Sequence, residues 1–246
     1  MVRYKAVISY DGTNFSGFQR QSAGRTVQGE LEKSLSEMAN KPIEIHASGR
    51  TDAKVHAIGQ VIHFDFPYER PLERMRYGID SRTPEDIACV SVEEVGDDFH
   101  ARYLAKGKTY EFRVDIGKPR SPFRRYYASY FPYPIDVEKI QQALPDLIGT
   151  HDFSAFCASG SSVEDKVRTI HEASLEVNPA GDELVFTFSG DGFLYKMIRI
   201  IVGTLLKIGN DRMPVDSLPG IIASKNRDLA GPTAHPEGLY LKEVIY

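Results

Sequence analysis

Stretches rich in β-branched and aromatic residues, separated by polar loops, predict most of the strands in the first part of the chain. They cover residues 2–10, 43–48, 59–66 and 87–95. Between the first two, apolar residues recur at helical spacing, which predicts a helix from Thr26 to about Asn40 with one buried face. A weaker helical pattern lies around 70–80. The predicted order is β-α-β-β-α-β.

The same order runs a second time in the rest of the chain. Strands are expected at 108–116, 126–133, 166–177, 183–189 and 239–246. One helix should begin after Asp136, which is a suitable N-cap, and Pro145 should kink or end it early. A second helix is expected between the last two strands.

These patterns predict an α+β fold of two ferredoxin-like, or RRM-like, halves. Their sheets should lie side by side as one continuous antiparallel or mixed sheet, with helices on one side. The expected domains are residues 1–101 and 102–246. The join, near 97–106, is not rich in Gly or Ser, so the halves should share a core across a rigid junction.

Composition narrows the class of protein. With 246 residues, 41% hydrophobic and 26% charged, the chain reads as a soluble globular protein. Its longest helical apolar stretch contains Arg199 and Lys207, so it falls short of the ~20 uninterrupted residues of a membrane span. Early charges such as Lys5 argue against a secretory signal, so a cytoplasmic location is expected. The only cysteines, Cys89 and Cys157, offer no metal or redox spacing.

The net charge of −4 hides a local asymmetry. Residues 102–125 carry eight basic side chains against two acidic ones. Aromatic residues are interleaved with them: Tyr103, Tyr110, Phe112, Phe123, Tyr126 and Tyr127. Such a segment suits a polyanion that offers phosphates to pair with and bases to stack on. A solvated pair of strands with ordinary charges explains the same pattern, and charge alone leaves both interpretations open.

Three short motifs resemble known binding or catalytic motifs, but each lacks a neighbouring residue that the motif requires. The sequence around Gly107 ends like a phosphate-binding P-loop but has Arg102 in place of the leading glycine. The glycines at 190 and 192 are followed by Tyr195 where a dinucleotide fingerprint needs a third glycine. His235 begins an H-x-E sequence, but no cysteine follows it, which excludes a zinc deaminase.

The segment GRTDAKVHA, residues 49–57, is a highly charged loop between two half-buried strands. A structural interpretation is that Asp52 makes an Asx-turn or pairs with Arg50 or Lys54. For a lone loop aspartate that interpretation is favoured. The sequence around Asp52 favours a functional role instead.

The chain resembles the TruA-type tRNA pseudouridine synthases nearly from end to end. The resemblance is carried by YDGTNFSGFQRQ with RTVQGELEKSL, SGRTDAKVHAIGQVIHF, FHARYLAKGKTYEF, GTHDFSAF and GDGFLYKMIRIIVGTLL, in the family's order. The closing GPTAHPEGLYLKEVIY is also similar. Three positions depart from the family's pattern: Phe18 replaces a tryptophan, Arg82 lies in a stretch lacking a leucine, and His235 replaces an apolar residue or proline.

The resemblance implies that Asp52 is the catalytic nucleophile, Arg199 its cationic partner, and Tyr110 the residue that stacks on the target base. Lys196 and Arg199 share a helix face apart from the apolar one. Considered with its helix alone, Arg199 is expected to extend its side chain along the helix edge to solvent. Considered together with the loop that carries Asp52, an ion pair between Arg199 and Asp52 is favoured. A strand tyrosine such as Tyr110 more often packs in a core.

Further residues are candidates for substrate binding. Arg50 is assigned to a phosphate or to flipping the uridine out of its stack. Lys106, Lys108 and Lys196 are expected to contact the RNA. His56 and Phe153 could contact substrate, although ordering the loop and packing the core explain them equally well.

The implied activity is isomerisation of uridine to pseudouridine at positions 38, 39 and 40 of the tRNA anticodon stem-loop. The rearrangement involves no redox change and no lost group, so no cofactor and no metal are expected. The family's members act as homodimers with an RNA-binding cleft on the sheet face opposite the helices, and both features are carried over as expectations.

Two other functions account for part of the sequence. A non-catalytic RRM-type module needs an aromatic residue where Lys108 stands, and it leaves the GRTD loop unexplained. A nucleoside hydrolase or glycosidase would use paired carboxylates, with Asp11 and Asp52 as candidates, but the basic aromatic segment argues against a small substrate.

Overall fold

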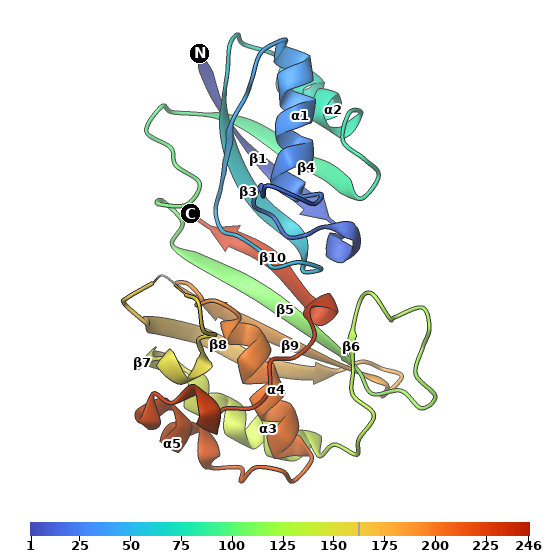
Figure 1. Ribbon diagram of the computed structural model, residues 1–246, viewed down its shortest axis with the longest axis vertical. Helices are drawn as coiled ribbons and strands as arrows, with labels where there is room; N and C mark the ends of the chain where they lie inside the picture. The colour runs from blue at the N-terminus through green and yellow to red at the C-terminus, as the bar shows by residue number, and fades with distance from the viewer. Residues whose placement is uncertain (162) are drawn as a thin grey trace. The chain divides into compact units, whose positions relative to one another are not determined.

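The computed structural model describes residues 1–161 and 163–246 (Figure 1). The chain forms two compact units, Met1–Lys106 with Tyr240–Tyr246, and Gly107–Leu239. We call them the first and the second unit. The division into domains 1–101 and 102–246 that fold independently stays a prediction.

The first unit has the predicted order β-α-β-β-α-β. Its elements are β1 (Val2–Tyr10), α1 (Val27–Ala39), β2 (Ile45–Ala47), β3 (His56–Phe66), α2 (Leu72–Asp80) and β4 (Ile87–Val95). β1 pairs antiparallel with both β3 and β4, and β2 pairs antiparallel with β3. The resulting order β4-β1-β3-β2 is that of a ferredoxin-like sheet.

The last strand, β10 (Leu239–Ile245), joins the first unit at β3. Tyr240 and Leu241 pair in parallel with the first two residues of β3, whereas β2 pairs further along, opposite residues 62–64. One edge of this eleven-residue strand therefore serves two partners. The sheet is mixed, as expected, because β10 runs parallel to β3.

Helices α1 and α2 lie on the same face of the first unit's sheet (Figure 1). Leu31 and Leu35 of α1 are fully buried, and so are Tyr4, Ala6 and Ile8, which occupy alternate positions of β1. The side chain of Thr26 caps α1 by accepting from the N–H of Gly29 at 3.2 Å, which confirms the predicted start.

The second unit has a four-stranded antiparallel path in the order β5-β9-β8-β7. The strands are β5 (Gly107–Asp115), β7 (Gly149–Asp152), β8 (Val167–Val177) and β9 (Glu183–Gly190). β6 (Ser129–Tyr130) pairs in parallel with β5. The expected strand at 126–133 is thus wrong in extent, because a hydrogen-bonded loop continues to Ala128.

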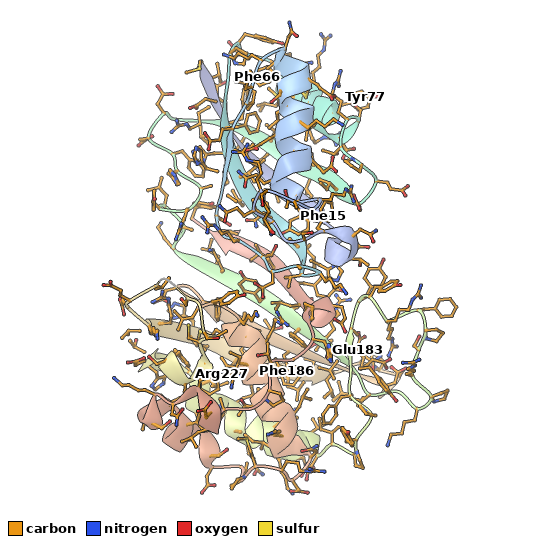
Figure 2. All side chains as sticks on the ribbon, in the orientation of Figure 1. Phe15, Phe66, Tyr77, Glu183, Phe186 and Arg227 are labelled. Atoms are coloured by element: carbon orange, nitrogen blue, oxygen red, sulfur yellow. The ribbon has the colours of Figure 1, made fainter. Side chains whose placement is uncertain are left out.

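The helices of the second unit are α3 (Val137–Ala143), α4 (Met197–Gly209) and α5 (Ser217–Ser224). Short 3₁₀ turns occur at Gly12–Asn14, Leu144–Leu147, Ser154–Phe156, Arg227–Leu229 and Pro236–Gly238. Asp136 caps α3 as predicted, and the helix gives way to a 3₁₀ turn at Pro145. Phe66 and Phe186, labelled in Figure 2, are fully buried, each in its own unit. Over the described ranges, no helix is long and apolar enough to cross a membrane.

Candidate active site

The loop that carries Asp52 is held from one side by the segment after β1. The N–H of Phe18 donates to the carbonyl of Thr51 at 3.0 Å, and the N–H of Lys54 donates to the carbonyl of Phe15 at 3.3 Å. The loop closes on itself where the N–H of Val55 donates to the carbonyl of Asp52 at 3.2 Å. Backbone bonds on both sides of Asp52 therefore fix its position in the first unit.

Gly12 makes the closest approach between these two segments. A Cβ at this position would lie 2.1 Å from the carbonyl oxygen of Val55, a distance that side-chain carbons do not reach. Only glycine allows the 3₁₀ turn that begins here to pack directly on the end of the Asp52 loop.

Tyr10 anchors the loop from the end of β1. Its hydroxyl lies 2.8 Å from Oγ1 of Thr51, the residue before Asp52, and both side chains are buried. Burial raises the pKa of Tyr10 to about 12, against the opposing effect of hydrogen bonds with Thr51 and Gln60. The phenol therefore stays neutral at physiological pH and holds Thr51 as a hydrogen-bonding partner.

His56, at the start of β3, is buried next to the loop. Its Nδ1 accepts from the N–H of Gly12 at 3.0 Å, and its ring stacks on Tyr240 with centroids 4.6 Å apart. Nδ1 also lies 3.2 Å from Oδ1 of Asp11. Nδ1 of His56 thus lies between a backbone donor and a carboxylate oxygen, and these contacts fix the ring beside the loop.

A buried polar pair supports the other end of the loop. The hydroxyl of Ser48 donates to Oε1 of Gln60 at 2.7 Å, and Nε2 of Gln60 donates to the carbonyl of Gly49 at 3.0 Å. Both side chains are buried. Between these supports Asp52 is half-buried, and Arg50, two positions earlier, is exposed.

In the second unit, Tyr110 lies near the middle of β5 with only 9% of its surface exposed. Its ring meets the ring of Phe193 edge-on, with centroids 5.4 Å apart. Lys108 lies two positions earlier in the strand and therefore on the same face, and it is half-buried. An aromatic ring with a cation on one strand face is suited to a nucleobase and its phosphate.

Arg199 lies in the first turn of α4 and is held by Ala234. Its Nε donates to the carbonyl of Ala234 at 2.8 Å, and the N–H of Ala234 donates to the carbonyl of Arg199 at 2.9 Å. Lys196 precedes the helix in the left-handed conformation with φ of 59°, and its Nζ lies 4.8 Å from the centroid of the Tyr195 ring. The start of α4 thus presents two cations of defined placement.

Phe153 and Lys106 are placed differently from these residues. Phe153 is fully buried, and its ring packs edge-on against Phe156 and His151. Lys106 is exposed at the end of the first unit, where its N–H donates to the carbonyl of Ile245 at 2.8 Å. Their expected contacts with substrate stay predictions.

The candidate residues fall into two groups. Arg50, Asp52 and His56 lie together in the first unit. Tyr110 and Arg199 belong to the second, with Lys108, Phe153 and Lys196. The ion pair between Asp52 and Arg199 stays a prediction. Over the described residues, no cluster of three or more His, Cys, Asp or Glu side chains is arranged to hold a metal ion.

Several residues that build the site were not singled out from the sequence. Tyr10, Gly12 and Ala234 bond or pack against the loop or the arginine from positions distant in the chain. The only local signal was the turn chemistry after Tyr10, which identifies a loop and says nothing of what that loop contacts.

Comparison with known proteins gives one family. A family model described as tRNA pseudouridine synthase matches residues 6–104 and 143–246, more than half of the chain. The matched stretches contain Asp52 and Arg199, whereas Tyr110 lies outside them. Two proteins named tRNA pseudouridine synthase A, from Streptococcus pneumoniae strains Hungary19A-6 and CGSP14, are each 60% identical over 247 residues, covering 100% of this chain and 99% of theirs.

Among solved structures, the crystal structure of a Cbf5-Nop10-Gar1 complex aligns with 82% of this chain and 45% of that chain. The TM-score is 0.40 and the sequence identity 14%, which is too low to support an argument about fold or function.

Proposed function

Because the chain belongs to the tRNA pseudouridine synthase family, we propose that it converts uridine to pseudouridine in the tRNA anticodon stem-loop, with Asp52 as the nucleophile. The uridines proposed are those at positions 38, 39 and 40. The coarser statement, an isomerase that acts on tRNA, follows from family membership.

The reaction balances without a second substrate. The C1′–N1 bond breaks, a C1′–C5 bond forms, the C5 hydrogen leaves as a proton, and N1 ends with a proton. A carboxylate is suited to this exchange because it can stabilise or trap an electron-poor sugar carbon while the base turns. No oxidant, reductant or metal is needed for the balance, so we propose a reaction without a cofactor.

The observation that carries the proposal is the way Asp52 is held. Its loop is bonded to the backbone of Phe15 and Phe18 and to the phenol of Tyr10 through Thr51. A nucleophile gains rate from such preorganisation, because reacting atoms held in position need less reordering in the transition state. A merely solvated aspartate needs no such support.

The other candidates take complementary roles in this proposal. The guanidinium of Arg199, oriented by Ala234, would keep the carboxylate of Asp52 ionised beside the charged RNA. Tyr110 would stack on the target base, and its phenol oxygen would accept the C5 proton at the end while the proton of its hydroxyl passes to solvent. Arg50 would contact a phosphate or flip the uridine out of its stack, with Lys106, Lys108 and Lys196 on phosphates.

We propose in addition that the protein acts as a homodimer. Two basic 102–125 segments would then line one groove, whereas the rest of each chain carries the excess of acidic residues. Such a groove would reconcile a negative net charge with a polyanionic substrate.

The competing hydrolase with paired carboxylates is not favoured by the surroundings of Asp11. Oδ1 of Asp11 accepts from the N–H of Thr13 at 2.9 Å and from its hydroxyl, which is how an aspartate caps a 3₁₀ turn. This gives Asp11 a structural role.

Release of tritium from tRNA labelled at uridine C5, without added cofactor and with a chelator present, tests the function. The wild-type protein should release label from a tRNA with uridines at positions 38, 39 and 40. Replacing those uridines by cytidines should abolish the release. Release that persists after the replacement would move the site elsewhere in tRNA. Formation of free uracil from uridine or UMP, without release of tritium, would favour the hydrolase.

A further inference from the structure

The loop between β5 and β6, residues 116–128, carries positive charges and exposed aromatic rings that are not needed to connect the two strands. It contains Lys118, Arg120, Arg124 and Arg125 and no acidic residue. Phe123 is 85% exposed, the highest value among the large hydrophobic side chains of the second unit that the structure describes. In Figure 1 this green loop projects from the strands of its unit. We call it the 116–128 loop.

The 116–128 loop is anchored from within by Asp115, which is 2% exposed. Its carboxylate accepts from the N–H of Gly117 at 3.0 Å and from the N–H of Ser121 at 3.2 Å. Arg124 approaches the same carboxylate at 3.5 Å and donates to Oδ1 of Asp182 at 3.1 Å. One of the four cations is therefore used to hold the loop.

Backbone bonds fix the segment around Phe123. The N–H of Arg124 donates to the carbonyl of Ser121 at 3.2 Å, and the N–H of Tyr127 donates to the carbonyl of Arg124 at 2.8 Å. Arg125 donates to the carbonyl of Pro122 at 2.6 Å, and its guanidinium lies 4.2 Å from the centroid of the Tyr126 ring. Phe123 is thus exposed on an ordered turn.

Tyr126 and Tyr127 of the same loop are exposed as well, and a group of exposed rings on an ordered turn suggests a partner that covers it. The three exposed cations around Phe123 favour a polyanion with flat apolar faces, which describes an RNA strand. Protein interfaces also contain aromatic residues and arginine, but their buried cores are depleted of charged residues, whereas three exposed cations accompany this ring. A second copy of this chain would bring an equally basic loop to any symmetric contact at this point.

We infer that the 116–128 loop is a contact element for RNA outside the reacting uridine, in which Phe123 stacks on a base and Lys118, Arg120 and Arg125 contact phosphates. The inference rests on the proposed function, because that function supplies the tRNA. Asp115 and Arg124 act as positioning residues that hold the loop in shape.

Binding of unlabelled tRNA and tritium release in single turnover, measured on the same preparations, test the inference. Phe123→Ala should weaken binding at least about fivefold, the lower end of the range for one base on an aromatic side chain. Phe123→Tyr should stay within twofold of wild type, and Phe123→Leu should behave as Phe123→Ala. Melting temperatures should be unchanged, because the side chain is exposed.

The matched control is Tyr77→Ala on α2, which removes another exposed aromatic ring, 66% exposed, from the first unit. It should leave binding unchanged. Replacing Lys118, Arg120 and Arg125 by Gln should reduce the slope of log Kd against log salt by about 2 to 3, at roughly 0.7 to 0.9 per phosphate.

Wild-type binding by Phe123→Ala, or by Phe123→Leu, would overturn the stacking role. A shift from dimer to monomer by Phe123→Ala in sedimentation, with binding per protomer unchanged, would assign the loop to an interface between copies and overturn the inference. Wild-type protein that binds tRNA but releases no tritium would refute the proposed function alone, because the binding comparison still tests the loop.

Discussion

Arg199 and Ala234 hold each other by two hydrogen bonds. The Nε of Arg199 donates to the carbonyl of Ala234, and the N–H of Ala234 donates back to the carbonyl of Arg199, at 2.8 and 2.9 Å. A backbone segment that precedes β10 therefore helps to orient the guanidinium plane.

Arg199→Lys separates charge from this orientation. Lysine keeps the positive charge but lacks the planar guanidinium and its Nε–H, so the bond to the carbonyl of Ala234 is lost. We expect turnover to fall at least about tenfold, with tRNA binding and melting temperature close to wild type. Single-turnover tritium release and filter binding measure the two effects. Full activity of the lysine variant would show that charge alone suffices.

Gly203 lets the segment before β10 reach α4. A Cβ at Gly203 would lie 1.8 Å from the carbonyl oxygen of Pro232, so Gly203→Ala must push that segment, and with it Ala234, away from the helix. We expect a loss of about 1–3 kcal/mol in the free energy of unfolding, together with reduced turnover.

The control is Gly220→Ala in α5, where a new Cβ meets nothing within 4 Å. Because alanine is favoured over glycine inside a helix, this variant should keep or gain up to about 1 kcal/mol and keep full activity. Urea unfolding of both variants measures the contrast. Equal stabilities would show that the Pro232 segment is not fixed at this point.

Tyr10→Phe tests the support of the Asp52 loop. It removes the hydroxyl that pairs with the buried Thr51, which should cost about 1 kcal/mol of stability and lower turnover through the displaced loop. Tyr68→Phe is the control, because Tyr68 is 49% exposed and its hydroxyl donates to Met38 in a different part of the unit. Turnover that is equally affected in both variants would deny Tyr10 a specific role.

The sequence predicts those elements whose contacts are local, between residues close together in the chain. β4 has the bounds expected from its residues, and α1 begins after Thr26, because alternation and capping are local. α5 was missed because Pro219 and Gly220 interrupt its short apolar pattern. β7 escapes prediction because its four residues, Gly149–Asp152, are too few to show a period and begin with a glycine in the left-handed region.

The candidate site divides in the same way. Asp52 was found because its loop resembles a family motif, whereas the bonds from Tyr10 and Phe18 to that loop join residues far apart in the chain. The contact of Ala234 with Arg199 is also long-range. The periodicity of the sequence does not predict a contact between residues distant in the chain. Each partner taken alone has the sequence features of an ordinary loop or strand residue.

Three histidines in the first unit give a pH dependence of stability. The rings of His46 and His63 stack with centroids 4.9 Å apart, and His100 lies 4.7 Å from His63. Nδ1 of His63 accepts from the N–H of Ala101 at 3.1 Å. Burial and then the neighbouring His100, His46 and Arg3 lower the pKa of His63 to about 4, against the weaker pull of Asp65.

The unfolded chain, with a histidine pKa near 6.5, therefore binds a proton before the folded chain does. Stability from this group is complete above about pH 6.5 and is lost as the pH falls to about 4, a change of about 3 kcal/mol. Urea unfolding between pH 4 and 7 measures the slope. His63→Asn should flatten it, whereas His171→Asn on the exposed part of β8 should not; an unchanged slope in His63→Asn would refute the assignment.

The most direct test of Asp52 as the nucleophile is single-turnover tritium release by Asp52→Ala with tRNA already bound. We predict no release over times at which wild type is complete, with tRNA binding within about tenfold of wild type, roughly 1.4 kcal/mol. Substantial release by the variant would contradict the assignment and remove Asp52 from the chemistry.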